Sequence, residues 1–397
     1  MDRLTTTTHS DPSRLTSVGA VNSPFPLTKT RGSTSRYAFA DVARTVALWG
    51  IVVMNYHAYL NGTSPITSTN PSAWEEIFHP RTGFFTTRFA ALFVVVAGIS
   101  VAFMTSNRND EDTSQKRLVI LRRGVLLMFV GGIFEWIWPG TILFYYGAYF
   151  LLGAALIRAR TVVIAACAVT SAVVATIIQT WRVGREYDGF YTDWLDPSYI
   201  DSPRELLLRT FVGYTHPVFP WFAFFCIGLL IGRLIPRMPE YRRRITVIAI
   251  LSATCAYVLR EIVYRATEDS SRSSALWRAL ASTDPFDRGL LYTISAASIA
   301  VIVIMAVYSW CERDQERSPL VSALQKIGQF TFTIYIGHAL FFNLVVHRLD
   351  LVRSTGLDTA LALSGFFLVL AVAIALWWTH VVGQGPVERC YRWLTGS

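Results

Sequence analysis

The sequence predicts an all-α bundle of transmembrane helices, with about ten spans and both termini in the cytoplasm. Only 16% of the 397 residues are charged, whereas a soluble globular chain carries about 25%. Hydrophobic residues make up 52% of the chain, and they gather in blocks of about 20 residues, the length that a helix needs to cross a bilayer. Basic and acidic loops alternate between these blocks, as they do in polytopic membrane proteins. These observations exclude an ordinary soluble fold.

The apolar blocks define the organisation of the chain. Residues 1–35 are rich in Ser, Thr and Pro and contain no apolar segment, so we interpret them as a disordered cytoplasmic tail. The transmembrane bundle is predicted over 36–382. Residues 383–397 are predicted to be a short cytoplasmic tail, whose apolar residues recur at the spacing of a helix lying on the membrane surface. The expected spans are 38–60, 84–105, 117–137, 141–157, 161–181, 206–235, 243–264, 289–311, 321–347 and 357–380.

The charges of the loops predict which loops face the cytoplasm. Basic residues gather after the second, fourth, sixth and eighth spans, for example at 242–244. Acidic residues gather in the longer loops after the first, fifth and seventh spans. Because basic loops are retained inside, the pattern places both termini in the cytoplasm. The same anchoring accounts for the net charge of +9, so the expected partner is the lipid bilayer and not a nucleic acid.

The sequence contains no signature of a soluble enzyme or of a metal site. It lacks GxSxG, a GxGxxG that opens a helix after a strand, the Walker A motif and HExxH. Its five cysteines are scattered, without the CxxC or Cys/His spacing that holds zinc, so no metal is expected. The informative residues are therefore the polar ones at membrane depth, where a polar group is costly.

The first expected span carries polar residues at both ends. Asp41, Arg44 and Asn55 fall within an arc of about 60° on a helix that advances about 100° per residue, so they face one side of a bundle. Asp41 and Arg44 are also explained by an interfacial ion pair that fixes the orientation of the helix. His57 ends the span at the opposite boundary. His338 lies within the ninth expected span, and a hydrogen bond between helices is its simplest explanation.

Ionisable residues gather at the predicted outer side. Histidine acts as a general base near neutral pH, and a carboxylate orients the histidine or accepts a proton. Each residue alone also has a structural explanation, as a satisfied hydrogen-bonding group at the membrane interface. For Glu135 that explanation is an ion pair with Arg88. As a set they predict an acid–base site, whose candidate catalytic residues are His57, His79, Glu135 and His216.

Motifs along nearly the whole chain resemble one family, in order. The entrance Arg36-x4-Asp41-x2-Arg44, followed by Asn55-Tyr56, resembles the start of heparan-α-glucosaminide N-acetyltransferase-like membrane proteins. Several later segments resemble the YeiB-like bacterial branch. These segments are Thr87 to Gly98, Phe144-Tyr145-Tyr146-Gly147, His216-Pro217-Val218-Phe219-Pro220-Trp221, Phe330 to Tyr335 and Gly385-Pro386-Val387-Glu388.

The resemblance implies a transmembrane acyltransferase. Such an enzyme takes an acetyl group, or another short acyl group, from cytoplasmic acyl-CoA to a hydroxyl or amine acceptor, here a sugar or lipid-linked glycan on the outer side. The animal enzyme's essential histidine lies in the first outer loop. His79 occupies that neighbourhood, but the loop does not align residue for residue and lacks the motif around that histidine. His57 resembles instead the histidine that closes the first span in related acyltransferases. We rank His57 and His79 equally.

Within this hypothesis the remaining polar residues have expected roles. Arg44, Arg122 and Arg123 at the cytoplasmic side are expected to attract the phosphates of CoA, although the retention of basic residues on the cytoplasmic side also explains Arg122 and Arg123. Asn55 and Arg88 are expected to contact the acceptor. A direct transfer and a two-step route through an acyl-histidine are both open.

A transporter or exporter of a small solute or lipid is the alternative, and a membrane scaffold is a third interpretation. Buried charges and Gly or Pro breaks suit a transporter, but the sequence shows no internal repeat of spans. An acyltransferase needs one pocket that reaches both faces, with a histidine in it and basic residues at its inner mouth. The sequence leaves open the acceptor, the acyl chain length and the oligomeric state, for which a homodimer is one candidate.

Overall fold

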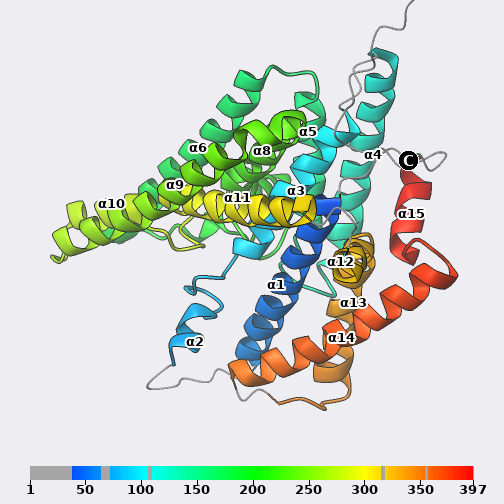
Figure 1. Cartoon of the computed structure of the whole chain (residues 1–397). Helices are drawn as coiled ribbons and strands as arrows, with labels where there is room; N and C mark the ends of the chain where they lie inside the picture. The colour runs from blue at the N-terminus through cyan, green and yellow to red at the C-terminus, as the bar shows by residue number, and fades with distance from the viewer. Residues whose placement is uncertain (1–37, 64–71, 106–109, 314–317, 354–355, 397) are drawn as a thin grey trace, which may run out of the picture. The chain divides into compact units, whose positions relative to one another are not determined.

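Every regular element in the described part of the chain is a helix (Figure 1). The computed structural model describes residues 38–63, 72–105, 110–313, 318–353 and 356–396. The helices confirm the predicted all-α class. The disordered tail predicted over 1–35 lies outside the described residues.

Most expected spans coincide with one helix, but the sixth, 206–235, begins within the short helix α7 (Pro203–Phe211) and becomes the long helix α8 (Val218–Leu234) only at Val218. The ninth expected span is a pair, α12 (Pro319–Gly328) and α13 (Thr331–Phe342), which is bent by 72° and continues as a π-helical turn, η3 (Asn343–Arg348). The single helices are α1 (Ala38–Thr63), α3 (Arg88–Met104), α4 (Asp110–Phe134), α5 (Leu143–Leu156), α6 (Thr161–Tyr187), α8 (Val218–Leu234), α9 (Met238–Ala266), α11 (Leu290–Arg313) and α14 (Leu357–Val381). Shorter elements are α2 (Ala73–Ile77), η1 (Asp193–Leu195), α7 (Pro203–Phe211), η2 (Ile235–Arg237), α10 (Arg272–Ala281) and α15 (Pro386–Thr395).

The chain is a multi-pass membrane protein, but the structure does not establish ten spans. Among the described residues, five helical segments are long and apolar enough to cross a membrane, or six if the bent pair α12–α13 counts as one. The apolar helices α3 and α5 have 17 and 14 residues, fewer than the roughly 20 that span a bilayer upright. Helix α4 begins with the charged run Asp110-Glu111-Asp112, which lowers its hydropathy.

One of the five segments, Val218–Ala266, is 49 residues long and reverses its direction at η2. Near the end of α8, Arg233 Nη1 donates to the carbonyl of Ala159, just before α6 begins (2.8 Å). At the end of α6, Tyr187 donates to the carbonyl of Ser270, just after α9 ends (2.9 Å). The end of α8 and the end of α9 therefore lie at opposite ends of α6, so α8 and α9 run in opposite directions.

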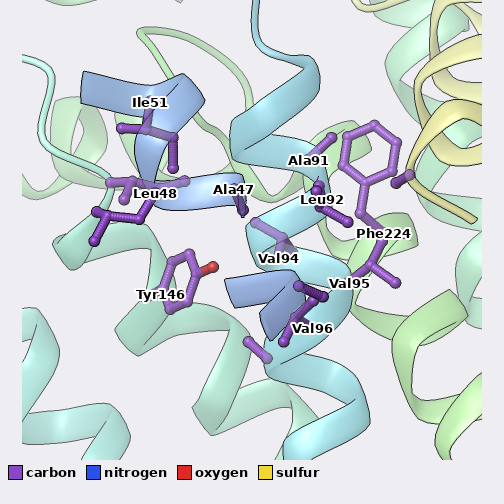
Figure 2. Packing of buried hydrophobic residues seen from close by; sticks show 14 of the residues in the cluster. Ala47, Leu48, Ile51, Ala91, Leu92, Val94, Val95, Val96, Tyr146 and Phe224 are labelled. Carbon is purple, nitrogen blue, oxygen red and sulfur yellow. The ribbon is translucent and has the colours of Figure 1, made fainter. Parts of the chain in front are cut away.

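The core of the bundle is built around a close contact of α3 with α8. A Cβ placed on Gly98 would lie 2.2 Å from the carbonyl oxygen of Phe225, and one placed on Gly228 would lie 2.1 Å from that of Val95. Only glycine permits this approach, which resembles the small-residue packing of membrane helices. Apolar side chains of α1, α3 and α8 fill the space beside the contact, and the hydroxyl oxygen of Tyr146 from α5 points in among them (Figure 2).

The C-terminal helix α15 is attached to the break in the ninth expected span. The Glu388 carboxylate accepts hydrogen bonds from the backbone N–H groups of Phe332 (2.7 Å) and Thr333 (3.1 Å), in the first turn of α13. The carboxylate therefore satisfies donors that a helix leaves free at its start, and its charge complements the helix dipole. This contact gives a structural reason for the Gly-Pro-Val-Glu segment.

Candidate functional site

His57, near the C-terminal end of α1, is held in one tautomer. Its side chain is 5% exposed, and Nδ1 lies 2.8 Å from the carbonyl oxygen of Phe78. Because a carbonyl only accepts, Nδ1 carries the proton and Nε2 of the neutral ring presents a lone pair. The amide nitrogen of Asn61 lies 3.5 Å from that Nε2. The arrangement leaves His57 Nε2 as the acceptor expected of a general base.

His79, one residue after the Phe78 carbonyl that binds His57, has the opposite arrangement. Its Nδ1 accepts from the backbone N–H groups of Thr82 (3.2 Å) and Arg81 (3.4 Å). The neutral ring therefore carries its proton on Nε2, as a donor. The structure brings His57 and His79 together and distinguishes them chemically, which the sequence did not.

The same loop adds a negative charge near the two histidines. Glu75 and Ser72 form a capping box at the start of α2, in which each side chain bonds the other residue's backbone N–H. The Ser72 backbone N–H, with its hydroxyl, lowers the pKa of the exposed Glu75 carboxyl below its usual value. The carboxylate is therefore ionised at neutral pH, and it lies within electrostatic reach of His57.

Glu135 is bound to Arg209, and the predicted ion pair with Arg88 is wrong. Glu135 Oε1 lies 2.6 Å from Arg209 Nη2 and accepts a hydrogen bond from the backbone N–H of Gly140 (2.8 Å). Arg209 belongs to the short helix α7, in the long loop before α8, and is 6% exposed. No motif marked Arg209 in the sequence. Its burial was indicated only by its position among apolar residues, in a loop that is otherwise rich in charged residues.

His216 lies on the same side of the bundle as Glu135, in an aromatic environment. Its ring centroid is 4.5 Å from that of Trp221 and 6.0 Å from that of Tyr145. Tyr145 also lies within electrostatic reach of Arg209 and Glu135, so it stands between His216 and that ion pair. The structure thus places the four catalytic candidates in two groups, His57 with His79 and Glu135 with His216. That the two groups surround one substrate pocket stays a prediction.

The C-terminal end of α1 also contacts the segment beside Glu135. The Tyr59 hydroxyl donates to the carbonyl of Pro139, and its ring stacks on Trp138 at 3.9 Å between centroids. The next residue, Gly140, donates its N–H to Glu135. The short 138–141 connection between α4 and α5 therefore lies against both α1 and the Glu135 ion pair.

Asn55 bonds across the bundle to His338. Asn55 Nδ2 lies 3.1 Å from His338 Nε2, and the Tyr56 hydroxyl donates to the His338 carbonyl (2.8 Å). His338 is fully buried, and Trp138 packs edge-on to its ring at 5.1 Å between centroids. The interpretation of His338 as a hydrogen bond between helices is confirmed. The acceptor contact predicted for Asn55 stays a prediction.

At the other end of α1, Asp41 and Arg44 form the expected ion pair. The two side chains meet at 2.6 Å, with Asp41 1% exposed. Arg44 Nη2 also donates to Ser100 of α3 (2.7 Å), and Gln329 at the α12–α13 break donates to Asp41 (3.4 Å). The pair therefore ties three elements together. Arg44 has a structural role, whatever it contributes to binding a donor.

Arg122 and Arg123 lie on α4 beside the C-terminal helix. The Arg123 guanidinium stands 5.6 Å from the ring centroid of Tyr391 in α15 and donates to the sulfur of Met104 (3.0 Å). Arg122 is exposed, with Nη1 near the backbone of Gly396. Of the three arginines predicted to attract CoA, Arg122 is exposed, whereas Arg44 and Arg123 are partly buried.

Two family descriptions together cover nearly the whole described chain. The family "Heparan-alpha-glucosaminide N-acetyltransferase, catalytic" matches residues 36–262, which contain all four catalytic candidates and the three candidate CoA-binding arginines. The family "Protein of unknown function (DUF418)" matches residues 233–397. No curated protein matches the chain.

The Glu135–Arg209 contact can be tested with a double-mutant cycle. Glu135→Gln, Arg209→Gln and the double variant are expected to show a coupling of about 1–3 kcal/mol in thermal unfolding in detergent, because each single change leaves a buried charge unpaired. The control is the half-exposed pair Asp188 and Arg272, whose coupling should stay below about 1 kcal/mol. A coupling no larger than that of the control would contradict the pairing.

Proposed function

We propose that this chain, which belongs to the heparan-alpha-glucosaminide N-acetyltransferase catalytic family, transfers an acetyl or other short acyl group from acyl-CoA to a hydroxyl or amine acceptor. A membrane acyltransferase-like function follows from the family. The donor, the sidedness and an outer acceptor, a sugar or a lipid-linked glycan, are our proposal.

The tautomer of His57 carries the proposal. Acyl transfer requires a base that removes the proton of the acceptor as its oxygen or nitrogen attacks the thioester carbonyl. Nδ1 of His57 is committed to the Phe78 carbonyl, so Nε2, whose contact with the Asn61 amide nitrogen is long (3.5 Å), is the nitrogen that serves as this base. When the tetrahedral intermediate collapses, the carbon–sulfur bond breaks, and the proton passes from His57 to the departing CoA thiolate.

His79 complements His57 in this scheme. Its Nε2 proton is available for donation because Nδ1 accepts from the Thr82 backbone. A donor at that position stabilises negative charge on the carbonyl oxygen during transfer. Glu135 and His216 remain in the proposal as groups on the acceptor side. A two-step route through an acyl-histidine stays the alternative to direct transfer.

The donor is proposed to approach from the cytoplasmic side, along α4. The exposed Arg122 guanidinium attracts CoA phosphates by charge and by paired hydrogen bonds. Arg123, a few ångströms from Tyr391, lies beside it, and Arg44 adds positive charge farther in.

The proposal retains ten spans with both termini inside. The reversal of direction between α8 and α9, shown by the contacts of Arg233 and Tyr187, supports two passes within the 49-residue segment. Single cysteines in a cysteine-free background are expected to label from outside at 190–200 and from inside at 236–242. The reverse labelling would reject the proposed sidedness.

The activity is tested by thiol release from acetyl-CoA with purified protein, screened over sugar and lipid acceptors. His57→Ala is expected to lower kcat about 100-fold or more, because general-base catalysis contributes 10²–10⁴-fold. The rate should also fall as the pH drops and the base is protonated. His380→Ala, an exposed change at the end of α14, is the control and should leave kcat unchanged.

Two outcomes of that assay would count against the scheme. Wild-type turnover that survives His57→Ala but not His79→Ala would move the base to the loop histidine. No thiol release with any acceptor would favour the transporter alternative, which the 72° break between α12 and α13 supports, since discontinuous helices form the substrate sites of many transporters.

The donor site predicts a separate change in KM. Arg122→Ala is expected to raise the KM for acetyl-CoA about 3–10-fold with kcat unchanged, and the effect should shrink at high salt, where phosphate–Arg attraction is screened. The control is Arg160→Ala, another exposed arginine in a predicted cytoplasmic loop. If both variants raised the KM equally, CoA would be attracted by the positive charge of these loops in general, and Arg122 would not belong to a local binding site.

A further inference from the structure

Arg88, in the first turn of α3, is a buried cation with unused hydrogen-bond donors. It is 4% exposed. A single nitrogen, Nη2, makes its three hydrogen bonds, to the Thr283 carbonyl (3.2 Å), the Ser295 hydroxyl (3.3 Å) and the Tyr257 hydroxyl (3.4 Å). Nε and Nη1 are buried without a partner. All three acceptors are neutral, so nothing in these contacts offsets the charge.

Two other buried arginines of the bundle, Arg209 and Arg288, have hydrogen-bond partners for both terminal nitrogens. Arg209 donates from one terminal nitrogen to Glu135 (2.6 Å) and from the other to the Ser198 carbonyl (2.7 Å). Arg288 donates from both terminal nitrogens to backbone carbonyls of the turn before α8. Burying guanidinium N–H groups that have no hydrogen-bond partner is strongly unfavourable. The exception at Arg88 therefore points to a missing ligand.

The surroundings of Arg88 suit an oxyanion. The guanidinium carbon lies 4.9 Å from the ring centroid of Tyr292, whose hydroxyl is 2.8 Å from that of Thr87. The Thr87–Tyr292 pair and Tyr257 supply hydroxyl groups that can donate to a carboxylate or phosphate, whereas the Ser295 hydroxyl donates to the Tyr292 carbonyl (2.9 Å). A water molecule would satisfy the free donors but would leave the charge uncompensated.

Arg88 is connected to the loop that holds the two candidate histidines. The Thr86 hydroxyl, two residues before Arg88, donates to the carbonyl of His79 (2.6 Å). Phe78, whose carbonyl binds His57, precedes His79 directly. The start of α3, which carries Arg88, is therefore tied to the loop that holds the two candidate histidines.

We propose that Arg88 binds a carboxylate or phosphate group carried by the acceptor, so that the acceptor is an anionic molecule. The anion site follows from the unpartnered guanidinium, whereas naming its ligand as the acceptor rests on the proposed function. Binding is therefore measured without acyl-CoA and without turnover, so that failure of the anion site and failure of the acyltransferase reading are distinguishable.

The test measures Tm of the purified full chain in detergent with acetate or inorganic phosphate, against chloride at equal ionic strength. Either probe should give wild type a saturable rise of about 2 °C or more, because a ligand of the folded state stabilises it. Acetate and phosphate distinguish a carboxylate from a phosphate site. An equal rise with chloride would overturn the proposal.

Arg88→Gln is expected to abolish the response and to leave Tm in chloride unchanged or higher, since it removes an uncompensated buried charge. Arg272→Gln, which removes an exposed arginine, is the control and should keep the response. A lower Tm with the anion response intact would show a purely structural Arg88. Should Arg88→Gln not fold, Arg88→Lys decides: the apparent Kd should weaken at least tenfold, and an unchanged Kd would overturn the proposal.

Discussion

The close approach of α3 to α8 at Gly98 and Gly228 is the constraint on which the rest of the bundle depends. The backbones meet where a single added methyl group would overlap a carbonyl oxygen. Helix α3 carries Ser100, the partner of Arg44, near one end and Arg88 at the other. Fixing α3 against α8 therefore positions a polar contact near one end of α3 and the proposed anion site at the other.

Hydrogen bonds and ion pairs between buried polar groups also hold the elements together. Water and charge are scarce inside a membrane bundle, so a polar side chain is retained where it finds a partner on another element. Arg44 joins α1 to α3, Asn55 joins α1 to α13, and Glu135 at the end of α4 binds Arg209 of α7. Several residues expected to serve chemistry thus also hold the structure together. A loss of activity in their variants must be read beside a measurement of stability.

The two neighbouring histidines, His57 and His79, illustrate how small structural details distinguish chemical roles. His57 and His79 have the same side chain and lie in neighbouring segments. One binds a backbone carbonyl and the other accepts from backbone N–H groups. The contacts make His57 the better base and His79 the better donor, although the sequence ranked them equally. The family explains why an acyl-transfer reaction is expected, and the hydrogen bonds suggest how the roles divide.

The sequence by itself determined the helical membrane class, the family and the Asp41–Arg44 pair. These depend on local properties: apolar blocks, ordered motifs and two side chains one turn apart on a helix. Tertiary structure alone decided that Glu135 binds Arg209, 74 residues away, that Asn55 meets His338, 283 residues away, and that Arg88 has no counter-charge among the described residues. Hydropathy and spacing are properties of neighbours along the chain, whereas the partner of a buried charge depends on which helices pack together.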